Sequence, residues 1–349
     1  MFAIKFIKRM KIAVLVIFAV MVLLSCNRGR LVDERKSDDY RYSLDKSKIY
    51  YRIENAQSIW RLGMPWDNKW IQMDDVDVKS FEIIKVNDDR FLFTGDTALF
   101  SKDKYHYFYM GKALKNIDYA TFIVGDNGLI KDKNHVYHCV NPEEILPNAN
   151  PRYFKRIIFN DPDIDSYWWS KDDKHYFMSD SIIDVDYATF KILTSSISID
   201  KNFIYRNFSF AKFAPSAPIT KYVILNDMMM MTDKYVYNIQ MDDSVVVLEL
   251  PVKDTKTVKV YSGSPYFRVD DKIYWINKEV KGADVNSFEV LKNAAQYAKD
   301  KNHVYSGDCI VGKADPKTAR YNDKEDRIED QNYIWVYSNE MKKFVPKRR

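Results

Sequence analysis

Histidine and cysteine are the side chains that acid–base chemistry or metal binding would use first in this chain. Of five histidines, four stand three residues after an aspartate in similar polar segments: His106, His135, His175 and His303. A catalytic residue normally occurs once in a chain, so recurrence at one position indicates duplication. His138 lies outside this register beside Cys139, but adjacent residues of a strand point to opposite faces. We therefore predict neither a catalytic histidine nor a zinc site.

The recurring aspartates could instead bind calcium through clustered oxygens. An EF-hand loop needs several oxygen ligands, a glycine at its sixth position and a terminal glutamate, and the lysine-rich loops of this chain lack that set. There is also no Gly-rich phosphate loop, no G-x-S-x-G segment and no H-E-x-x-H segment. Carboxylate pairs such as Asp38-Asp39 are sequence neighbours, so no glycosidase pair can be nominated. We expect no catalytic residue, no metal and no cofactor.

Three tryptophans form the remaining cluster of chemical interest. Trp60, Trp66 and Trp70 fall in the segment SIWRLGMPWDNKW. Such rings could stack on a sugar or anchor a partner, with Asp67 or Asp74 as acids for carbohydrate chemistry. More often such a segment caps one exposed end of a repeat array, as terminal repeats must do. Both interpretations stay open.

A repeated segment sets the positions of most of these residues. The heptamer KDKNHVY occurs at 131–137 and again at 299–305. Related segments, each an Asp-Lys turn followed by a hydrophobic and aromatic stretch, occur at 45–51, 103–109, 132–137, 172–177, 200–205, 232–237, 270–275 and 300–305. After a first gap of 58 residues, the leading aspartates recur every 30–40 residues or so, which is the spacing of a structural repeat.

A second signature recurs out of phase with the first. An Asp or Asn stands four residues before a Phe at 77–81, 118–122, 150–154, 186–190 and 284–288. The Phe opens a short alternating stretch such as FEII or FEVL, which predicts a half-buried strand. Asp and Asn tolerate left-handed backbone geometry and hydrogen-bond nearby amides, so the Asp-Lys-Asn segments predict tight β-hairpins. We expect one complete unit at 271–305.

The DKN-x-VY turns and the D-x-x-[TS]-F openings together resemble the DKNYY family of bacterial repeat proteins. The resemblance covers most of 100–315, with a weaker unit at 45–51. Residues 206–230 and 238–269 fit poorly, and Ala319 replaces the expected Phe after Asp315, so we expect the repeat to decay there. The resemblance implies an envelope or secreted repeat protein and carries no activity with it.

The fold class follows from composition and from the repeat. Tyr (25) and Phe (20) are abundant while Gly is scarce (10), and aromatic residues favour strands. We predict an all-β protein of tandem short antiparallel strands and hairpins, either propeller-like or an open β-solenoid.

The first 26 residues predict export and a lipid anchor. Four basic residues (Lys5, Lys8, Arg9 and Lys11) precede an apolar run of about thirteen residues, which fits a secretory signal and is short for a membrane span. Leu23-Leu24-Ser25-Cys26 resembles the lipobox of bacterial lipoproteins, whose cysteine is acylated. Asn27 favours the outer membrane over the inner one in a Gram-negative cell. The start could be Met1 or Met10.

Charge argues against nucleic-acid binding. The formal charge of +5 falls to about +1 without the four signal residues, and acids and bases alternate along the chain. A nucleic-acid-binding face would concentrate positive charge. The last eight residues, KKFVPKRR, carry five basic charges, and we expect them to be solvated. Cys139 and Cys309 could form a disulfide, or both could stay reduced.

The predicted layout is a signal peptide (1–25), a flexible tether (26–47), an aromatic-rich repeat or cap region (48–100), DKNYY-like β repeats (101–340) and a basic tail (341–349). The predicted function is a membrane-anchored bacterial envelope lipoprotein that binds or scaffolds without catalysis. Its expected partner is an envelope protein or a surface glycan. The alternative is a carbohydrate-binding or carbohydrate-active surface protein.

Overall fold

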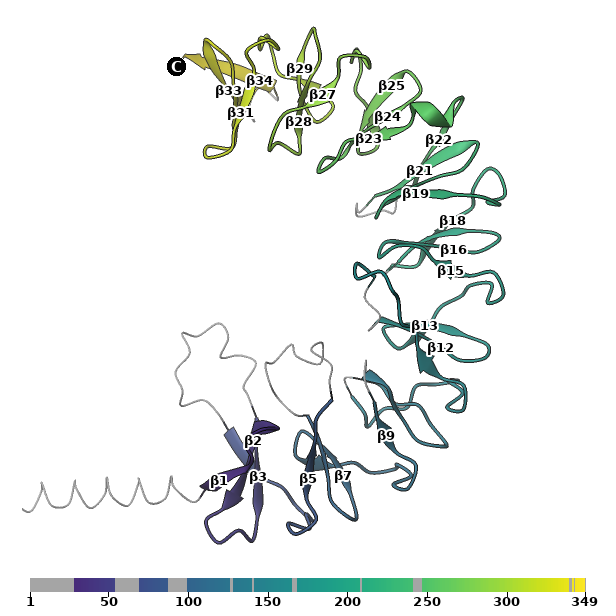
Figure 1. The fold of residues 1–349 in the computed structure, drawn as a ribbon, viewed down its shortest axis with the longest axis vertical. Coiled ribbons are helices and arrows are strands. Elements are labelled where there is room, and N and C mark those ends of the chain that lie inside the picture. The colour runs from purple at the N-terminus through teal and green to yellow at the C-terminus, as the bar shows by residue number, and fades with distance from the viewer. Residues whose placement is uncertain are drawn as a thin grey trace, which may run out of the picture. The chain divides into compact units, whose positions relative to one another are not determined.

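A computed structural model describes residues 28–53, 69–86, 99–125, 128–139, 141–164, 168–207, 209–240, 247–338, 341 and 343–348. Over these residues the chain consists of β-strands and connecting turns, with no α-helix and with one short 3₁₀ helix, η5 (Thr255–Thr257). It divides into two compact units, Met1–Ile183 and Asp184–Arg349. Figure 1 shows the small sheets of which each unit is made.

Unit 1 contains three four-stranded sheets and one two-stranded sheet among its described residues, all antiparallel. The first sheet comprises β1 (Arg28–Asp33), β2 (Ser37–Ser43), β3 (Ile49–Ile53) and β4 (Lys69–Gln72). The second comprises β5 (Glu82–Ile84), β6 (Phe100–Lys102), β7 (Tyr107–Tyr109) and β8 (Lys112–Ala113). Next come the pair β9 (Ile123–Val124) and β10 (Ile130–Lys131), then β11 (Lys155–Arg156), β12 (Trp169–Lys171), β13 (Tyr176–Met178) and β14 (Ser181–Ile182).

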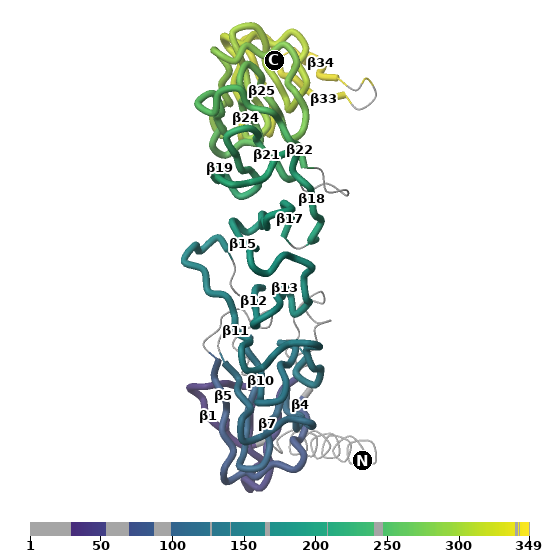
Figure 2. Tube along the Cα trace, turned by 90° about the vertical axis from the view of Figure 1, so that its right-hand side faces the viewer, coloured from purple at the N-terminus to yellow at the C-terminus, as the bar shows by residue number. Residues whose placement is uncertain are grey.

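Unit 2 contains five four-stranded antiparallel sheets among its described residues. The first two comprise β15 (Lys191–Ile192), β16 (Ile197–Ile199), β17 (Ile204–Arg206) and β18 (Ala211–Phe213), then β19 (Val223–Asn226), β20 (Met229–Met231), β21 (Tyr235–Ile239) and β22 (Val247–Pro251). The third and fourth comprise β23 (Lys259–Val260), β24 (Tyr266–Val269), β25 (Lys272–Trp275) and β26 (Lys278–Glu279), then β27 (Glu289–Val290), β28 (Tyr297–Lys299), β29 (Val304–Ser306) and β30 (Cys309–Ile310). The fifth comprises β31 (Arg320–Asn322), β32 (Arg327–Glu329), β33 (Tyr333–Ser338) and β34 (Lys343–Arg348). The hairpin β33–β34 projects from the rest of the unit (Figure 2).

Each sheet is a meander whose strands follow chain order, and within each unit buried clusters join neighbouring sheets. In unit 1, one buried cluster joins Tyr40 and Tyr51 of the first sheet to Phe108 of the second. In unit 2, another cluster joins Tyr266 of β24 to Tyr305 of β29. Nearest-neighbour packing of this kind is the signature of a repeat protein. The predicted all-β class with tandem antiparallel repeats is therefore confirmed, and no described sheet closes into a barrel.

In six of the repeats a hairpin aspartate holds the unit together, and we call these residues the clamp aspartates: Asp103, Asp132, Asp172, Asp200, Asp300 and Asp330. All six are nearly fully buried. In the example of Asp300, Oδ1 accepts the amides of Asn302 (2.7 Å) and His303 (2.7 Å), which close the turn. Its Oδ2 accepts the amide of Asp284 at 2.7 Å, so one carboxylate joins the hairpin to the turn that opens the repeat. The other five clamp aspartates accept the corresponding amides.

The two sequence signatures are thus halves of one hydrogen-bonded unit. Lys301 follows the clamp aspartate, and its ammonium lies 2.7 Å from Oδ2 of Asp284, the first residue of the D-x-x-[TS]-F signature. The amide of Lys301 also donates to the hydroxyl of Ser287 at 3.1 Å. The same pair of contacts recurs in the repeats at 77–104, 118–133 and 186–201. This explains why Asp, Ser or Thr, and Lys keep their spacing.

The aromatic residues of the two signatures also meet. The ring centroids of Phe288 and Tyr305 lie 5.8 Å apart, and both side chains are buried. The Tyr305 hydroxyl donates to the clamp Asp300 at 2.7 Å, which satisfies the polar end of a buried ring. Phe122 with Tyr137 and Phe190 with Tyr205 repeat this contact.

The hairpin prediction is confirmed, but its backbone mechanism is different from the one expected. None of the six clamp aspartates has a positive φ, because the turn is held by their side chains. Left-handed residues occur instead at other turns, including the one between the third and fourth strands of the second sheet, at Met110 (φ 47°) and Gly111 (φ 77°). There a Cβ on Gly111 would lie 2.6 Å from the Cβ of Tyr51, so the neighbouring sheet leaves room for glycine alone.

Two parts of the predicted layout are wrong. Residues 28–43 are strands β1 and β2 rather than part of a flexible tether, because Tyr40 and Tyr42 point into the core while Arg41 points away. The basic tail is largely strand β34, which pairs with β33 along six residues and packs Phe344 on the last core cluster. The predicted boundaries at 48, 100 and 340 consequently cut through sheets.

The repeat unit is also in a different phase from the one expected at 271–305. The strand at 272–275 is β25, which pairs with β24 and β26, whereas β27, β28 and β29 belong to the next sheet. A ninth hairpin at 330–335 was missed, because Gln331 stands where most other repeats have lysine and Trp335 where they have tyrosine or phenylalanine. The Trp335 Nε1 donates to Asp330 at 2.8 Å, so the repeat persists despite Ala319.

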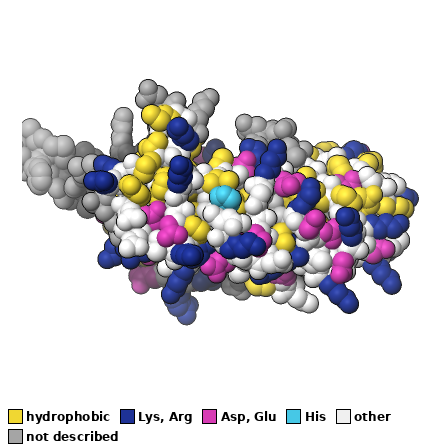
Figure 3. Space-filling model, turned by 90° about the horizontal axis from the view of Figure 1, so that it is seen from above, with side chains coloured by type: hydrophobic (Ala, Val, Ile, Leu, Met, Phe, Trp, Pro, Cys, Tyr) yellow, Lys and Arg dark blue, Asp and Glu magenta, His cyan; other side chains and the backbone are white. Residues whose placement is uncertain are grey.

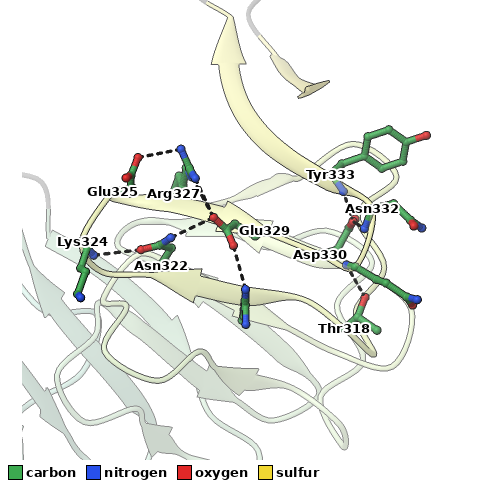
Figure 4. A network of polar contacts seen from close by, with 11 residues as sticks. Thr318, Asn322, Lys324, Glu325, Arg327, Glu329, Asp330, Asn332 and Tyr333 are labelled. Carbon is green, nitrogen blue, oxygen red and sulfur yellow. Dashed lines mark hydrogen bonds and ion pairs between the residues drawn. The ribbon is translucent and has the colours of Figure 1, made fainter. Parts of the chain in front are cut away.

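The sheet β31–β34 carries a network of polar contacts (Figure 4). Ile328 points into the core, so its neighbour Glu329 points to the opposite face. Glu329 is nevertheless only 2% exposed, and its carboxylate accepts hydrogen bonds from Arg327 (3.0 Å), Asn322 (3.0 Å) and Arg320 (3.3 Å). These donors satisfy a buried carboxylate on the side of the sheet that lies away from the core.

Replacing a clamp aspartate should loosen one repeat and leave the others intact. In an Asp300→Ala variant, the amides of Asp284, Asn302 and His303 lose their buried acceptor, at a cost of roughly 2–3 kcal/mol. Hydrogen exchange followed by mass spectrometry should show faster exchange in peptides covering 284–306. The matched control is Asp271→Asn at an exposed position. Equal protection of 284–306 in both variants would contradict the clamp.

The clamps should also make stability depend on pH in the acid range. Burial alone would raise the pKa of Asp300, but hydrogen bonds from the Asp284 amide and the Tyr305 hydroxyl outweigh it and hold the pKa below its usual value. A lowered folded pKa means that the stabilisation is present above the unfolded value, near 3.9, and is lost as the pH falls through the folded value. The Lys301 ammonium and Ser287 hydroxyl lower the pKa of Asp284 to about 2.

Removing one donor should therefore move acid unfolding to higher pH. Tyr305→Phe takes away a hydrogen bond to the ionised Asp300 and should shift the acid midpoint upward by roughly a few tenths of a pH unit. Circular dichroism during acid titration measures this shift. Tyr274→Phe, which removes a hydroxyl outside the clamps, serves as the control. A midpoint that moves equally in both variants would refute the assignment.

Candidate binding groove

A groove of about 400 Å³ lies in unit 1 between the second sheet and the β9–β10 pair. Strands β5 and β9, which Figure 1 shows in neighbouring sheets, border it. Its apolar lining comes from Ile83, Ile84, Tyr107, Phe122, Ile123 and Val124. Its charged lining comes from Lys36, Glu82, Lys85 and Lys102. The volume falls within the range of small-ligand sites, and the groove is open to solvent.

Aromatic packing makes the wall of the groove rigid. The ring centroids of Tyr107 and Phe122 lie 4.7 Å apart, and those of Tyr107 and Tyr119 lie 5.1 Å apart. The Tyr107 hydroxyl donates to the carbonyl of Phe122 at 3.3 Å, and the Tyr119 hydroxyl donates to the carbonyl of Asp103. The three rings pack on one another and two of them, Tyr107 and Tyr119, have anchored hydroxyls, so they cannot reorient freely and the surface offered to a ligand is preformed.

The lysines around the groove differ in whether they form an ion pair or a hydrogen bond. The Lys102 ammonium lies 2.8 Å from Oε1 of Glu82, and this hydrogen bond raises the pKa of Lys102. The Lys36 ammonium donates to the main-chain carbonyl of Ile83 at 3.0 Å. Lys85 is exposed and has no ion pair or hydrogen bond among the described residues. The arrangement can bind a molecule with apolar and anionic parts.

Most of the residues predicted to carry function lie outside the described part of the chain. This holds for the lipid-attachment residue Cys26, for Trp60 and Trp66, and for Asp67. Trp70 lies in β4, is half-buried, and has the guanidinium carbon of Arg41 at 5.5 Å from its ring centroid. It does not line the groove. The ligand site formed by the three tryptophans stays a prediction.

The four recurrent histidines occupy one structural position, as predicted. The amides of His106, His135, His175 and His303 each donate to their clamp aspartate. Nδ1 of the first three lies 3.4–4.0 Å from that carboxylate. In the described part of the chain, no cluster of three or more His, Cys, Asp or Glu side chains is placed to hold a metal ion.

His138 and Cys139 meet a buried ion pair instead. The Cys139 amide donates to Oδ2 of Asp180 at 2.9 Å, and Nδ1 of His138 lies 3.7 Å from the same oxygen. The Arg156 guanidinium donates to Oδ1 of Asp180 at 3.2 Å and to the carbonyl of Gly128 at 2.8 Å. These contacts join consecutive repeats of unit 1. Cys139 is buried and Cys309 exposed, and the two are not joined by a disulfide.

The groove residues were missed at the sequence level, although one signal was available. Ile123 directly follows the Phe of the second signature, where Glu82, Lys155 and Glu289 stand in other repeats. Among the repeats that carry the second signature, an aliphatic residue at a position that is otherwise charged marks a surface with a different use.

Breaking the buried ion pair should destabilise unit 1. Arg156→Met leaves the buried Asp180 carboxylate without its guanidinium, which should cost roughly 3 kcal/mol in urea unfolding. Arg152→Met, at an exposed position, is the matched control and should stay within about 0.5 kcal/mol of the parent. Equal losses in the two variants would show that the pair contributes nothing particular.

Among the described residues there is no helix of sufficient length and apolarity to span a membrane. Basic and acidic side chains are interspersed on the face drawn in Figure 3, in line with the alternating charges of the sequence.

Comparison with known proteins agrees with the repeat geometry. No curated protein and no solved structure matches the chain. The family model described as "DKNYY family" matches residues 4–141 and 266–347, which is more than half of the chain. Residues between the two matches carry the same clamps, at Asp172 and Asp200, so the repeat continues through them. The chain belongs to the DKNYY family.

Proposed function

We propose that this protein is a membrane-anchored lipoprotein of a bacterial cell envelope whose repeat array binds another molecule without catalysis. The anchor is inferred from Cys26, which follows a basic and then apolar leader in a segment similar to a lipobox. Because β1 begins at Arg28, an acylated Cys26 would hold the first sheet close to the membrane surface. Asn27 favours the outer membrane if the cell is Gram-negative.

The groove is the observation that supports binding. It combines a rigid aromatic wall, exposed aliphatic surface and lysines, which suits recognition of a partner. The recurring aspartates, lysines and histidines, which are the residues most often used in catalysis, are engaged in the clamps of successive repeats. A structural use accounts for their recurrence, and a catalytic use does not.

Glycan binding through the tryptophans has less support. Of Trp60, Trp66 and Trp70, only Trp70 lies in the described residues, and the Arg41 guanidinium lies over its ring. A sugar would have to compete with this cation for one face of the indole.

Lipid attachment can be tested directly on the full-length protein. Cells expressing the chain are fed an alkyne-tagged fatty acid, and labelled protein is detected after gel electrophoresis. We expect labelling of the parent and a complete loss in Cys26→Ala, because acylation needs the thiol. Cys139→Ala and Cys309→Ala are matched controls and should keep the label. An unlabelled parent, or a label retained in Cys26→Ala, would refute the anchor.

A further inference from the structure

One position of the repeat departs from the others at the groove. The second signature ends at a Phe, or at Ala319 in the last repeat. In every described repeat with this signature, the next residue along the chain is exposed. It is charged in five of these repeats: Glu82, Lys155, Lys191, Glu289 and Arg320. In the repeat that lines the groove it is Ile123, whose side chain is 49% exposed. The fold does not require an aliphatic residue there, since the other repeats form without one.

With isoleucine in place of glutamate at this position, the repeat lacks the ion pair that other repeats form there. The lysine on the facing strand has other hydrogen-bond partners instead. Glu82 and Glu289 lie 2.8 Å and 3.4 Å from the lysines that face them, Lys102 and Lys299. The lysine that faces Ile123 is Lys131, and its ammonium instead donates to the carbonyls of Pro151 (2.9 Å) and Phe154 (3.2 Å). The repeat therefore keeps its stabilising contacts while its surface beside Ile84 and Val124 becomes apolar.

The groove is bordered by main-chain groups that have no strand partner among the described residues. In that part of the chain, strand β5 pairs only with β6, and β9 pairs only with β10. The Ile83 carbonyl points away from β6, because it accepts the Lys36 ammonium. In an antiparallel strand the amide of the same residue points to the same side. This edge can therefore pair with an added extended chain once Lys36 yields the carbonyl.

The charge around the edge selects the chemistry of that chain. Three lysines (Lys36, Lys85 and Lys102) and one glutamate (Glu82) line the groove, so it is positive by two charges. Such a surface attracts acidic segments and repels basic ones.

We propose that the groove binds an extended acidic peptide segment with aliphatic side chains, which adds to the edge of β5 and packs on Ile123. This deepens the proposed function and rests on its binding role, but it does not depend on the lipid at Cys26. Main-chain pairing supplies the extended geometry, and Ile84, Ile123 and Val124 receive alternate side chains.

The test uses full-length protein in detergent and a fluorescein-labelled hexapeptide of alternating valine and glutamate. Fluorescence anisotropy measures binding. Ile123→Glu gives this repeat the residue that two others carry, so the variant should fold, and it should weaken binding roughly tenfold or more. The matched control is Ile310→Glu on β30, also an exposed isoleucine (42%) outside the groove, and it should bind like the parent.

Charge reversal and backbone blocking test the other two features. Lys85→Glu should weaken binding of the acidic peptide about threefold to tenfold and strengthen binding of a valine–lysine peptide. An acidic peptide whose central amides are N-methylated should bind far more weakly, since it cannot pair with the β5 edge.

Several results would overturn the proposal. These are no binding of the acidic peptide, equal binding by Ile123→Glu and the parent, or equal binding of acidic and basic peptides. A neutral oligosaccharide such as cellohexaose that binds in the groove, while the peptide does not, would replace the peptide with a glycan. Fatty-acid labelling at Cys26 would stand in each case, so failure here is distinguishable from failure of the anchor.

Discussion

The buried carboxylate of the clamp aspartate is the interaction on which six of the repeats depend. It accepts amides from its own hairpin and from the turn that opens the repeat, so one side chain fixes two segments that lie 14 to 26 residues apart. Burying a charge is costly unless it is fully hydrogen-bonded. Here the donors are main-chain amides whose positions the turn determines. Neighbouring repeats within a unit then associate through apolar packing, to which polar contacts such as the Arg156–Asp180 pair are added.

Because the recurring residues are used to hold the turns, function depends on the positions where repeats differ. The turn is held by the aspartate and lysine of the repeat, together with the Phe of the second signature and the Tyr of the hairpin. These residues recur for that reason. Ile123 is not committed in this way, because other repeats form with Glu, Lys or Arg at its position. In a repeat protein, an irregularity that the fold does not need is therefore a better guide to binding than any recurring polar residue.

Much of the fold could be predicted because hairpin turns are encoded locally. Eight hairpin segments were found from Asp-Lys spacing, and the hairpin at 330–335 was missed because Gln331 and Trp335 replace the usual residues. The phase of the unit was wrong because alternation does not reveal which neighbour a strand pairs with. The strands at 28–43 were missed because arginine and aspartate on one face, at Arg41 and Asp39, concealed the buried tyrosines on the other.

By itself, the sequence determined the all-β class, the repeat and the shared position of the histidines, since each follows from contacts within a few residues along the chain. Only the tertiary structure showed that the two signatures form a single clamp, that β34 completes the last sheet, and that Ile84, Ile123 and Lys36 meet at one groove. These juxtapositions join residues tens of positions apart. Packing between sheets brings these residues together, and a local pattern of residue types does not specify contacts between residues so far apart in the sequence.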